Sequence, residues 1–255
     1  MKNNYKFIYL IGNDYSEILK KLPLKDNLFI VANDREFLNN QLRHNYKKIL
    51  KERVIFLQYN NLKRKLLKIK SKYLISLSWR RFISKDITNK FTYAINIHPA
   101  ILPFYKGIHP LPHILKNNEK FHGITAHLIE DQIDEGKIIL IKKFRINKFS
   151  TIESLHDLYM NYLPFFIKRL IKKIESNKKI IFKNNELNKT KIFALKRSPR
   201  HSKIDSAKSL AKVYDDIRSC HQKKYPPFII INGEKIFISL SRRLPMNRKK
   251  NKFDI

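Results

Sequence analysis

The chain has 255 residues, 43% of them hydrophobic, which suits one large domain or a main domain with a small addition. Its 54 Lys and Arg outnumber its 21 Asp and Glu, giving a formal net charge of +33. The single cysteine, Cys220, excludes an intrachain disulfide framework. No apolar run reaches the ~18 residues of a membrane span, and the apolar run 7–11 is too short for a signal peptide. We therefore expect a cytoplasmic protein without membrane partners.

The first eighty residues alternate apolar strands with helical segments. Buried strands are predicted over residues 7–12, 27–32, 54–58 and 73–78. Helical segments are predicted over residues 15–22, 34–42 and 60–71, with Asp34 as an N-cap. This alternation predicts an α/β fold with a doubly wound, mostly parallel sheet, which binds ligands beyond the carboxyl ends of its strands.

Two common phosphate-binding motifs are missing from the sequence. The first strand ends in Ile11-Gly12-Asn13-Asp14 and is not followed by G-x-G-x-x-G, and G-x-x-x-x-G-K-[ST] occurs nowhere. A dinucleotide fingerprint and a P-loop are therefore unsupported.

The segment Asn96-Ile97-His98-Pro99 carries the strongest chemical signal. A strand over 93–97 delivers an amide and an imidazole two residues apart, on the same side of the strand. A second strand, 123–129, leads to an Asp-Glu-Gly turn that places Asp134 36 residues after His98. Amide, imidazole and carboxylate together suit acyl transfer to an amine, because the first two can stabilise an oxyanion and the carboxylate can orient the imidazole.

Three pieces of this region, residues 96–107, 123–129 and 133–136, resemble the signature of the 10-formyltetrahydrofolate-dependent formyltransferases. That family includes methionyl-tRNA, glycinamide ribonucleotide and amino-sugar formyltransferases. The resemblance implies a formyltransferase-like sheet and no metal, with three catalytic residues: Asn96, His98 and Asp134.

The same resemblance implies residues that contact the ligands. Those expected against the co-substrate, 10-formyltetrahydrofolate, are Arg80, Phe82, Ile83 and Ile133. Those expected to bind the acceptor or line the site are Lys106, Gly107 and His127. An alternative for the loop after the fourth strand stays open, in which Trp79 belongs to the core and Arg80 to the surface.

Histidines are concentrated around this motif, since five of the nine lie within 30 residues. His109 and His113 have the i, i+4 spacing of metal ligands, but no H-E-x-x-H is present and the cysteine is almost a hundred residues away. We therefore expect no metal site, and we expect His109, His113 and His122 in turns or at the surface.

The positive charge lies outside the predicted site. Residues 96–136 contain three lysines against five acidic residues, whereas basic residues cluster over 63–72, 168–179 and 242–252. One interpretation is compositional drift, because the chain is rich in Lys, Asn and Ile at positions expected to face solvent. The other is an RNA-binding surface.

The C-terminal third predicts a long helix followed by a small unit. Ser150 and Glu153 form a capping box that opens the helix, and Pro164 is expected to kink or split it. We assign residues 1–182 to the catalytic domain, 191–246 to a small α+β appendage and 247–255 to a tail. The appendage combines a helix capped by Ser206 with a hairpin over 228–238, whose Asn-Gly turn is of type I′.

The appendage also resembles the region that follows the catalytic domain in tRNA and amino-sugar formyltransferases. The activity implied is formyl transfer from 10-formyltetrahydrofolate to a primary amine, for which we favour a small molecule, the amino group of a nucleotide-linked sugar, because the appendage is compact. Methionyl-tRNA, glycinamide ribonucleotide and a catalytically inactive, basic RNA-binding protein remain alternatives. A homodimer is left open.

Overall fold

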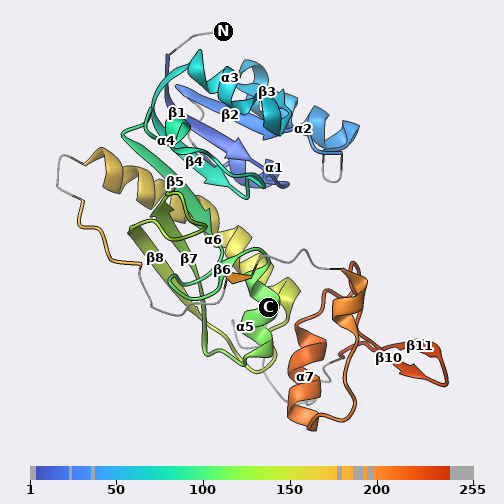
Figure 1. Cartoon of the computed structure of the whole chain (residues 1–255). Helices are drawn as coiled ribbons and strands as arrows, with labels where there is room; N and C mark the ends of the chain where they lie inside the picture. The colour runs from blue at the N-terminus through green and yellow to red at the C-terminus, as the bar shows by residue number, and fades with distance from the viewer. Residues whose placement is uncertain are drawn as a thin grey trace, which may run out of the picture.

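A computed structural model describes residues 4–22, 25–35, 38–176, 180–185, 192–193 and 198–241. Its centre is a seven-stranded sheet with the strand order β3-β2-β1-β4-β5-β7-β8 (Figure 1). The strands are β1 (Asn4–Ile11), β2 (Asn27–Ala32), β3 (Val54–Leu57), β4 (Lys70–Leu77), β5 (Tyr93–His98), β7 (Phe121–Leu128) and β8 (Ile138–Arg145).

Five of these strands are parallel, which confirms the predicted α/β class. β1 pairs in parallel with β2 and β4, and these pair in parallel with β3 and β5. β7 then runs antiparallel to both β5 and β8. The sequence analysis missed β8, whose apolar residues are followed by the basic stretch Lys142-Lys143.

Helices cover both faces of the sheet. One face packs against α1 (Ser16–Leu19), α2 (Asn40–Leu50) and α6 (Ile152–Glu175). The other packs against α3 (Leu62–Leu67) and α4 (Lys85–Thr88), and against Trp79, which is 9% exposed. Short 3₁₀ turns over Lys51–Arg53 and Tyr59–Asn61 precede β3 and α3. Trp79 thus belongs to the core, as one of the two interpretations of its loop predicted.

The second helix begins later than predicted. Asp34 is not its N-cap, because α2 starts at Asn40 and the side chain of Asn39 accepts a hydrogen bond from Leu42 N at 2.8 Å. Leu42, Tyr46 and Leu50 then share one buried face. The first helix is also shorter than the predicted 15–22, since α1 covers four residues.

The long helix α6 is capped one residue later than predicted. Thr151 is the N-cap and exchanges hydrogen bonds with Ser154, at 2.9 and 3.3 Å. Ser150 is buried instead and bonds to Asn147. The helix runs unbroken through Pro164, so the predicted split does not occur.

Residues 198–241 form a small unit beside α5 (Pro110–Lys116), at the end of the molecule opposite β3 (Figure 1). The unit contains a 3₁₀ turn (Pro199–Ser202), α7 (Leu210–Arg218) and a hairpin of β10 (Phe228–Ile231) and β11 (Glu234–Phe237). Asn232 and Gly233 have φ of 49° and 84°, which confirms the predicted hairpin turn. Ser206 does not cap α7, which begins after Ser209.

The small unit is attached to the loops after α5 and before α6 by a buried arginine. Arg218 is 2% exposed and pairs with Asp215 at 2.8 Å. It also donates to the carbonyl of Ser150 at 3.2 Å and to the Asn118 side chain at 3.1 Å. The predicted tail, 247–255, lies outside the described residues.

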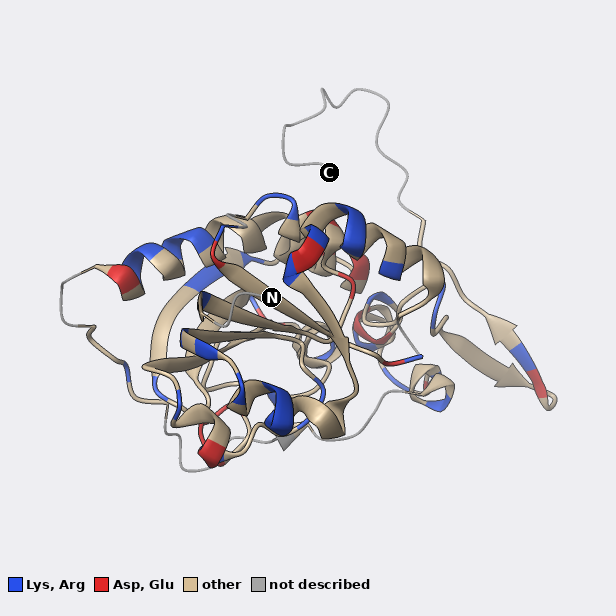
Figure 2. Ribbon diagram, turned by 90° about the horizontal axis from the view of Figure 1, so that it is seen from above, with Lys and Arg blue, Asp and Glu red and all other residues tan. Residues whose placement is uncertain are grey.

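Lys and Arg are frequent in the helices that cover the sheet. Figure 2 shows Lys and Arg in helices on both sides of the sheet. None of the described helices combines the length and the apolar character that crossing a bilayer requires.

Candidate active site

The site is built at the carboxyl end of β5, beside β7. Asn96 pairs with His127 and His98 pairs with Thr125 in the β5–β7 register. Because side chains alternate along a strand, all four lie on one face of the sheet. His98, Thr125 and His127 are buried, with exposed fractions of 3%, 0% and 2%.

Asp134 reaches this face from the turn between β7 and β8. Its Oδ2 lies 3.3 Å from His98 Nδ1, and its Oδ1 lies 3.2 Å from His127 Nε2. Asn96 Nδ2 donates to Oδ1 at 3.1 Å, and Gly107 N donates to Oδ2 at 2.8 Å. The carboxylate therefore holds two imidazoles, an amide and a backbone N–H in one cluster.

The charges in this cluster are interdependent. Burial alone would raise the pKa of Asp134, but the charges of His98 and His127, with their hydrogen bonds, hold that pKa well below its usual value. Burial lowers the pKa of His98, and the Asp134 charge opposes this effect. Asp134 is therefore an anion at neutral pH, beside an imidazole whose pKa burial keeps below its usual value despite this anion.

A rigid loop closes the other side of His98. His98 Nε2 donates to the carbonyl of Tyr105 at 2.8 Å, and Tyr105 adopts a φ of 58°. Thr125 anchors the start of the loop, because its hydroxyl donates to Ala100 O at 2.7 Å and accepts from Leu102 N at 3.1 Å. A substrate oxygen could reach His98 Nε2 only in exchange for the Tyr105 carbonyl.

Lys106 joins this loop to the turn that carries Asp134. Its side chain is 2% exposed, and its Nζ lies 3.1 Å from Glu135 Oε1. Lys106 and Gly107 also form β6 (Lys106–Gly107), which pairs with β9 (Ile192–Phe193). Lys106 thus lies beside the turn that carries Asp134, with its ammonium group occupied by Glu135, and its contact with the acceptor stays a prediction.

The residues predicted against the co-substrate do not all come together. Phe82 and Ile133 expose 62% and 53% of their surface, while Ile83 is buried. Arg80 Nη1 lies 3.4 Å from Asp34 Oδ2, at the end of β2. The exposed apolar pair is available to a flat ring, whereas Arg80 is directed toward a different strand.

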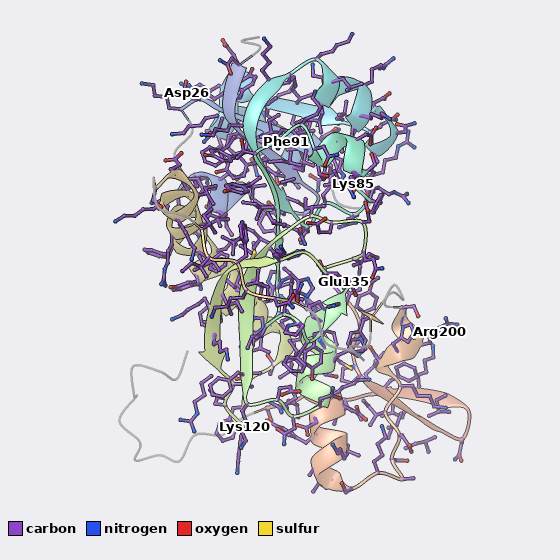
Figure 3. The ribbon with its side chains drawn as sticks, turned by 60° about the vertical axis from the view of Figure 1, so that its left-hand side comes forward. Asp26, Lys85, Phe91, Lys120, Glu135 and Arg200 are labelled. Atoms are coloured by element: carbon purple, nitrogen blue, oxygen red, sulfur yellow. The ribbon has the colours of Figure 1, made fainter. Side chains whose placement is uncertain are left out.

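A hollow of about 450 Å³ lies at the start of β5, beside α4. Ile83 lines it together with Ile129 and Asp131, but Asn96, His98 and Asp134 are not among the described residues of its lining. Figure 3 shows Lys85 and Phe91 of this lining and, below them, Glu135 of the site turn.

The histidines outside the cluster do not form a metal site within the described ranges, where no group of three His, Cys, Asp or Glu side chains is arranged to hold an ion. His113 stacks on Phe193, with ring centroids 3.9 Å apart. The expectation for His122 was wrong, since it is fully buried on β7 near Phe144. Burial lowers the pKa of His122 to about 4.

Two supporting residues escaped the sequence analysis. Thr125 lies on a strand that was predicted, and its position two residues before His127 would have placed it on the same face. Asn185 bonds to the backbone of the Asp134 turn from fifty residues away. No pattern in the sequence signals that contact.

Residues 35–161 match the family described as formyl transferase, and this range contains the entire cluster. The bifunctional polymyxin resistance protein ArnA of Wigglesworthia glossinidia brevipalpis is 30% identical over 181 residues, 69% of this chain and 27% of that protein. The methionyl-tRNA formyltransferase of Finegoldia magna is 30% identical over 94 residues, 36% of this chain and 30% of that enzyme. The chain therefore belongs to the formyl transferase family, although it spans less than a third of either relative.

Solved structures share the fold over nearly the whole chain. An N-formyltransferase of Helicobacter canadensis, in complex with folinic acid and dTDP-3-aminofucose, has a TM-score of 0.68 at 23% identity and covers 91% of this chain and 86% of its own. A sugar N-formyltransferase of a Shewanella species gives 0.69 at 15%, covering 94% and 99%. The methionyl-tRNA formyltransferase of Clostridium thermocellum gives 0.59 at 19%, covering 94% of both chains.

Proposed function

We propose that the protein is an enzyme that transfers a formyl group from 10-formyltetrahydrofolate to the amino group of a nucleotide-linked sugar. The observation that carries the proposal is the convergence of Asn96, His98 and Asp134, with Asp134 within 3.3 Å of both other side chains. Membership of the formyl transferase family supports the same chemistry.

The cluster suits the charge that develops in this reaction. The amine nitrogen bonds to the formyl carbon, whose oxygen becomes an oxyanion, and the folate nitrogen leaves with a proton. Asn96 Nδ2 can donate to that oxyanion, and a protonated His98 can add a second donor when its Nε2 exchanges the Tyr105 carbonyl for the oxyanion. Asp134, kept anionic by its neighbours, stabilises the imidazolium and can help to relay the proton of the attacking amine to the leaving folate nitrogen.

The surroundings of the cluster fit a flat heterocycle with polar edges. Phe82 and Ile133 expose apolar surface, and the hollow that Ile83 lines also contains the acceptors Glu130 and Asp131. Exposed apolar side chains beside a few polar groups are typical of ligand sites. We assign the folate to Phe82, Ile83 and Ile133, and leave Arg80 out because it is held by Asp34.

The sugar acceptor is supported by the extent of the fold. A sugar N-formyltransferase is covered over 99% of its length at a TM-score of 0.69, against 0.59 for the methionyl-tRNA formyltransferase. Glycinamide ribonucleotide is disfavoured as the acceptor by the loop after β1. There, Asp14 Oδ1 accepts hydrogen bonds from the N–H and the hydroxyl of Ser16. A carboxylate in that place repels a phosphate.

Charged initiator tRNA is a second candidate, favoured by the net charge of +33. An assay of formyl-folate turnover against amino-sugar nucleotides, glycinamide ribonucleotide and methionyl-tRNA separates the candidates. We expect turnover with an amino-sugar nucleotide. Turnover with methionyl-tRNA alone would replace the sugar acceptor, and salt-dependent RNA binding without turnover on any acceptor would overturn the enzyme assignment.

A further inference from the structure

Asn185 follows α6, about fifty residues after Asp134 in the chain, yet contacts the turn that carries Asp134. Its Nδ2 donates to the carbonyl of Asp134 at 2.7 Å and to the carbonyl of Gly136 at 2.9 Å. The side chain is 1% exposed. Both neighbours are carbonyl oxygens, which only accept hydrogen bonds, so the orientation of the amide is fixed by its donors.

The turn depends on an external support of this kind. Asp134 has a φ of 55°, a left-handed conformation that few residues other than glycine, asparagine and aspartate adopt. Buried carbonyl groups on such a turn need donors, because an unpaired buried carbonyl costs free energy. Asn185 supplies both donors from one side chain.

The chain around Asn185 is itself firmly placed against the sheet. Lys183 and Ile138 exchange two backbone hydrogen bonds of 2.9 Å at the start of β8. Farther along, the carbonyl of Phe193 accepts from Ile108 N at 2.7 Å, next to the loop that contacts His98. The segment after α6 therefore touches both loops that close the cluster.

We propose that Asn185 is a positioning residue of the active site, which holds the Asp134 turn so that its carboxylate meets His98, His127 and Asn96. This inference rests on the proposed formyl transfer for its kinetic consequence. Asn185 lies outside residues 35–161, the range that matches the family. Asn185 acts through Asp134 and does not need to touch the substrate.

The test replaces Asn185 by leucine, which keeps most of the volume and removes both donors. We expect kcat to fall by about 10- to 100-fold, because a displacement of about 1 Å in a catalytic group can cost about 100-fold. The KM for each substrate should change much less, since the side chains assigned to the ligands are untouched. An unchanged kcat in the folded variant, or a change confined to KM, would overturn the proposal.

A matched control separates positioning from general stability. Asn147 also makes two side-chain hydrogen bonds, to Phe149 N at 2.8 Å and to the Ser150 hydroxyl at 3.2 Å, in the loop before α6. Asn147→Ala should lower the melting temperature while kcat stays at the wild-type value. If Asn185→Leu and Asn147→Ala reduced kcat alike, the effect of Asn185 would be one of stability only.

A second readout does not depend on catalysis. Nitrogen-15 resonances of the His98 and His127 rings, measured over a pH series, report on the nearby Asp134 carboxylate. In Asn185→Leu, or in Asn185→Ala if leucine prevents folding, we expect His98 to take its proton at lower pH, because the anion has moved away. Unchanged ring resonances would overturn the proposal even if the wild-type protein formylated no acceptor.

The wild-type protein offers a further check that needs no variant. Both amide hydrogens of Asn185 are donated to carbonyls in a buried place, so they should exchange with solvent much more slowly than those of exposed asparagines. Slow exchange would support the two bonds. Fast exchange of both hydrogens would overturn them.

Discussion

The carboxylate of Asp134 lies 3.3 Å from the imidazole of His98, although β6, α5 and β7 separate the two residues in the chain. The opposite ring nitrogen of His98 donates to the carbonyl of Tyr105 at 2.8 Å. Both nitrogens thus face groups that accept hydrogen bonds, and only the imidazolium can donate to both. This arrangement favours the protonated ring against the effect of burial.

The first prediction concerns the charge of Asp134. Asp134→Asn keeps an oxygen that can accept from Gly107 N, so the fold should survive, but the anion between the two imidazoles is lost. We expect kcat for formyl transfer to fall by about 100- to 10,000-fold. Asp157→Asn, at a side chain 75% exposed on α6, is the control and should leave kcat unchanged. Equal activity of the two variants would contradict the role of Asp134.

Much of this arrangement could be predicted from the sequence, because local signals carried it. The parallel strands are continuous apolar runs, and the period of a strand alone puts Asn96 and His98 on one face. The Asn-Gly turn of the hairpin has a fixed conformation, which the structure shows. Where local chemistry determines the geometry, the prediction and the structure agree.

The prediction and the structure differ where contacts between residues far apart in the sequence determine the conformation. Asn39, and not Asp34, caps α2, since both are good caps and the packing of Leu42 and Tyr46 selects one. His122 is buried because β7 lies inside the sheet, next to a strand that was not predicted. Arg80, after β4, forms an ion pair with Asp34, after β2. Asn185 contacts the Asp134 turn although it follows α6 in the chain.

The second prediction concerns the pH dependence of stability. The pKa of His122 is about 4 in the folded protein and about 6.5 in an unfolded chain, so between these values the unfolded state binds the extra proton. Stability contributed by the neutral ring is present above pH 6.5 and is lost as the pH falls toward 4, by about 3 kcal/mol in total.

Replacing His122 by phenylalanine should remove this dependence. Urea unfolding at pH 7.5 and pH 5 measures it, and the variant should lose less stability than the wild type on acidification. His122→Leu serves as a second apolar replacement with a different shape. If both variants lost as much stability as the wild type between these pH values, another group would be responsible.

The third prediction compares two glycines with positive φ. A Cβ on Gly107, at a φ of 94°, would lie 2.4 Å from the carbonyl oxygen of Phe193, whereas one on Gly233, at 84°, would meet nothing within 4 Å. Gly233→Ala should therefore cost only the backbone strain, about 1–2 kcal/mol. Gly107→Ala must also displace β9 or the loop whose N–H holds Asp134.

Activity should distinguish these two variants more sharply than stability. We expect Gly107→Ala to lower kcat by at least about 10-fold, since the hydrogen bond that fixes Asp134 is disturbed. Gly233→Ala should keep the wild-type kcat. Steady-state formylation and thermal unfolding of both proteins, measured side by side, check the prediction, which fails if Gly107→Ala is fully active.

The fourth prediction concerns the attachment of the small C-terminal unit, where Arg218 is buried together with Asp215. Arg218→Leu leaves the Asp215 carboxylate buried without its partner, which should destabilise the protein by about 3–5 kcal/mol in urea unfolding. The double variant with Asp215→Leu removes both charges and should recover much of that loss. Lys208→Met breaks an ion pair with Asp216 whose lysine is 45% exposed, and it should cost less than about 1 kcal/mol. A loss in Arg218→Leu no larger than in Lys208→Met would show that the unit is held by its apolar contacts instead.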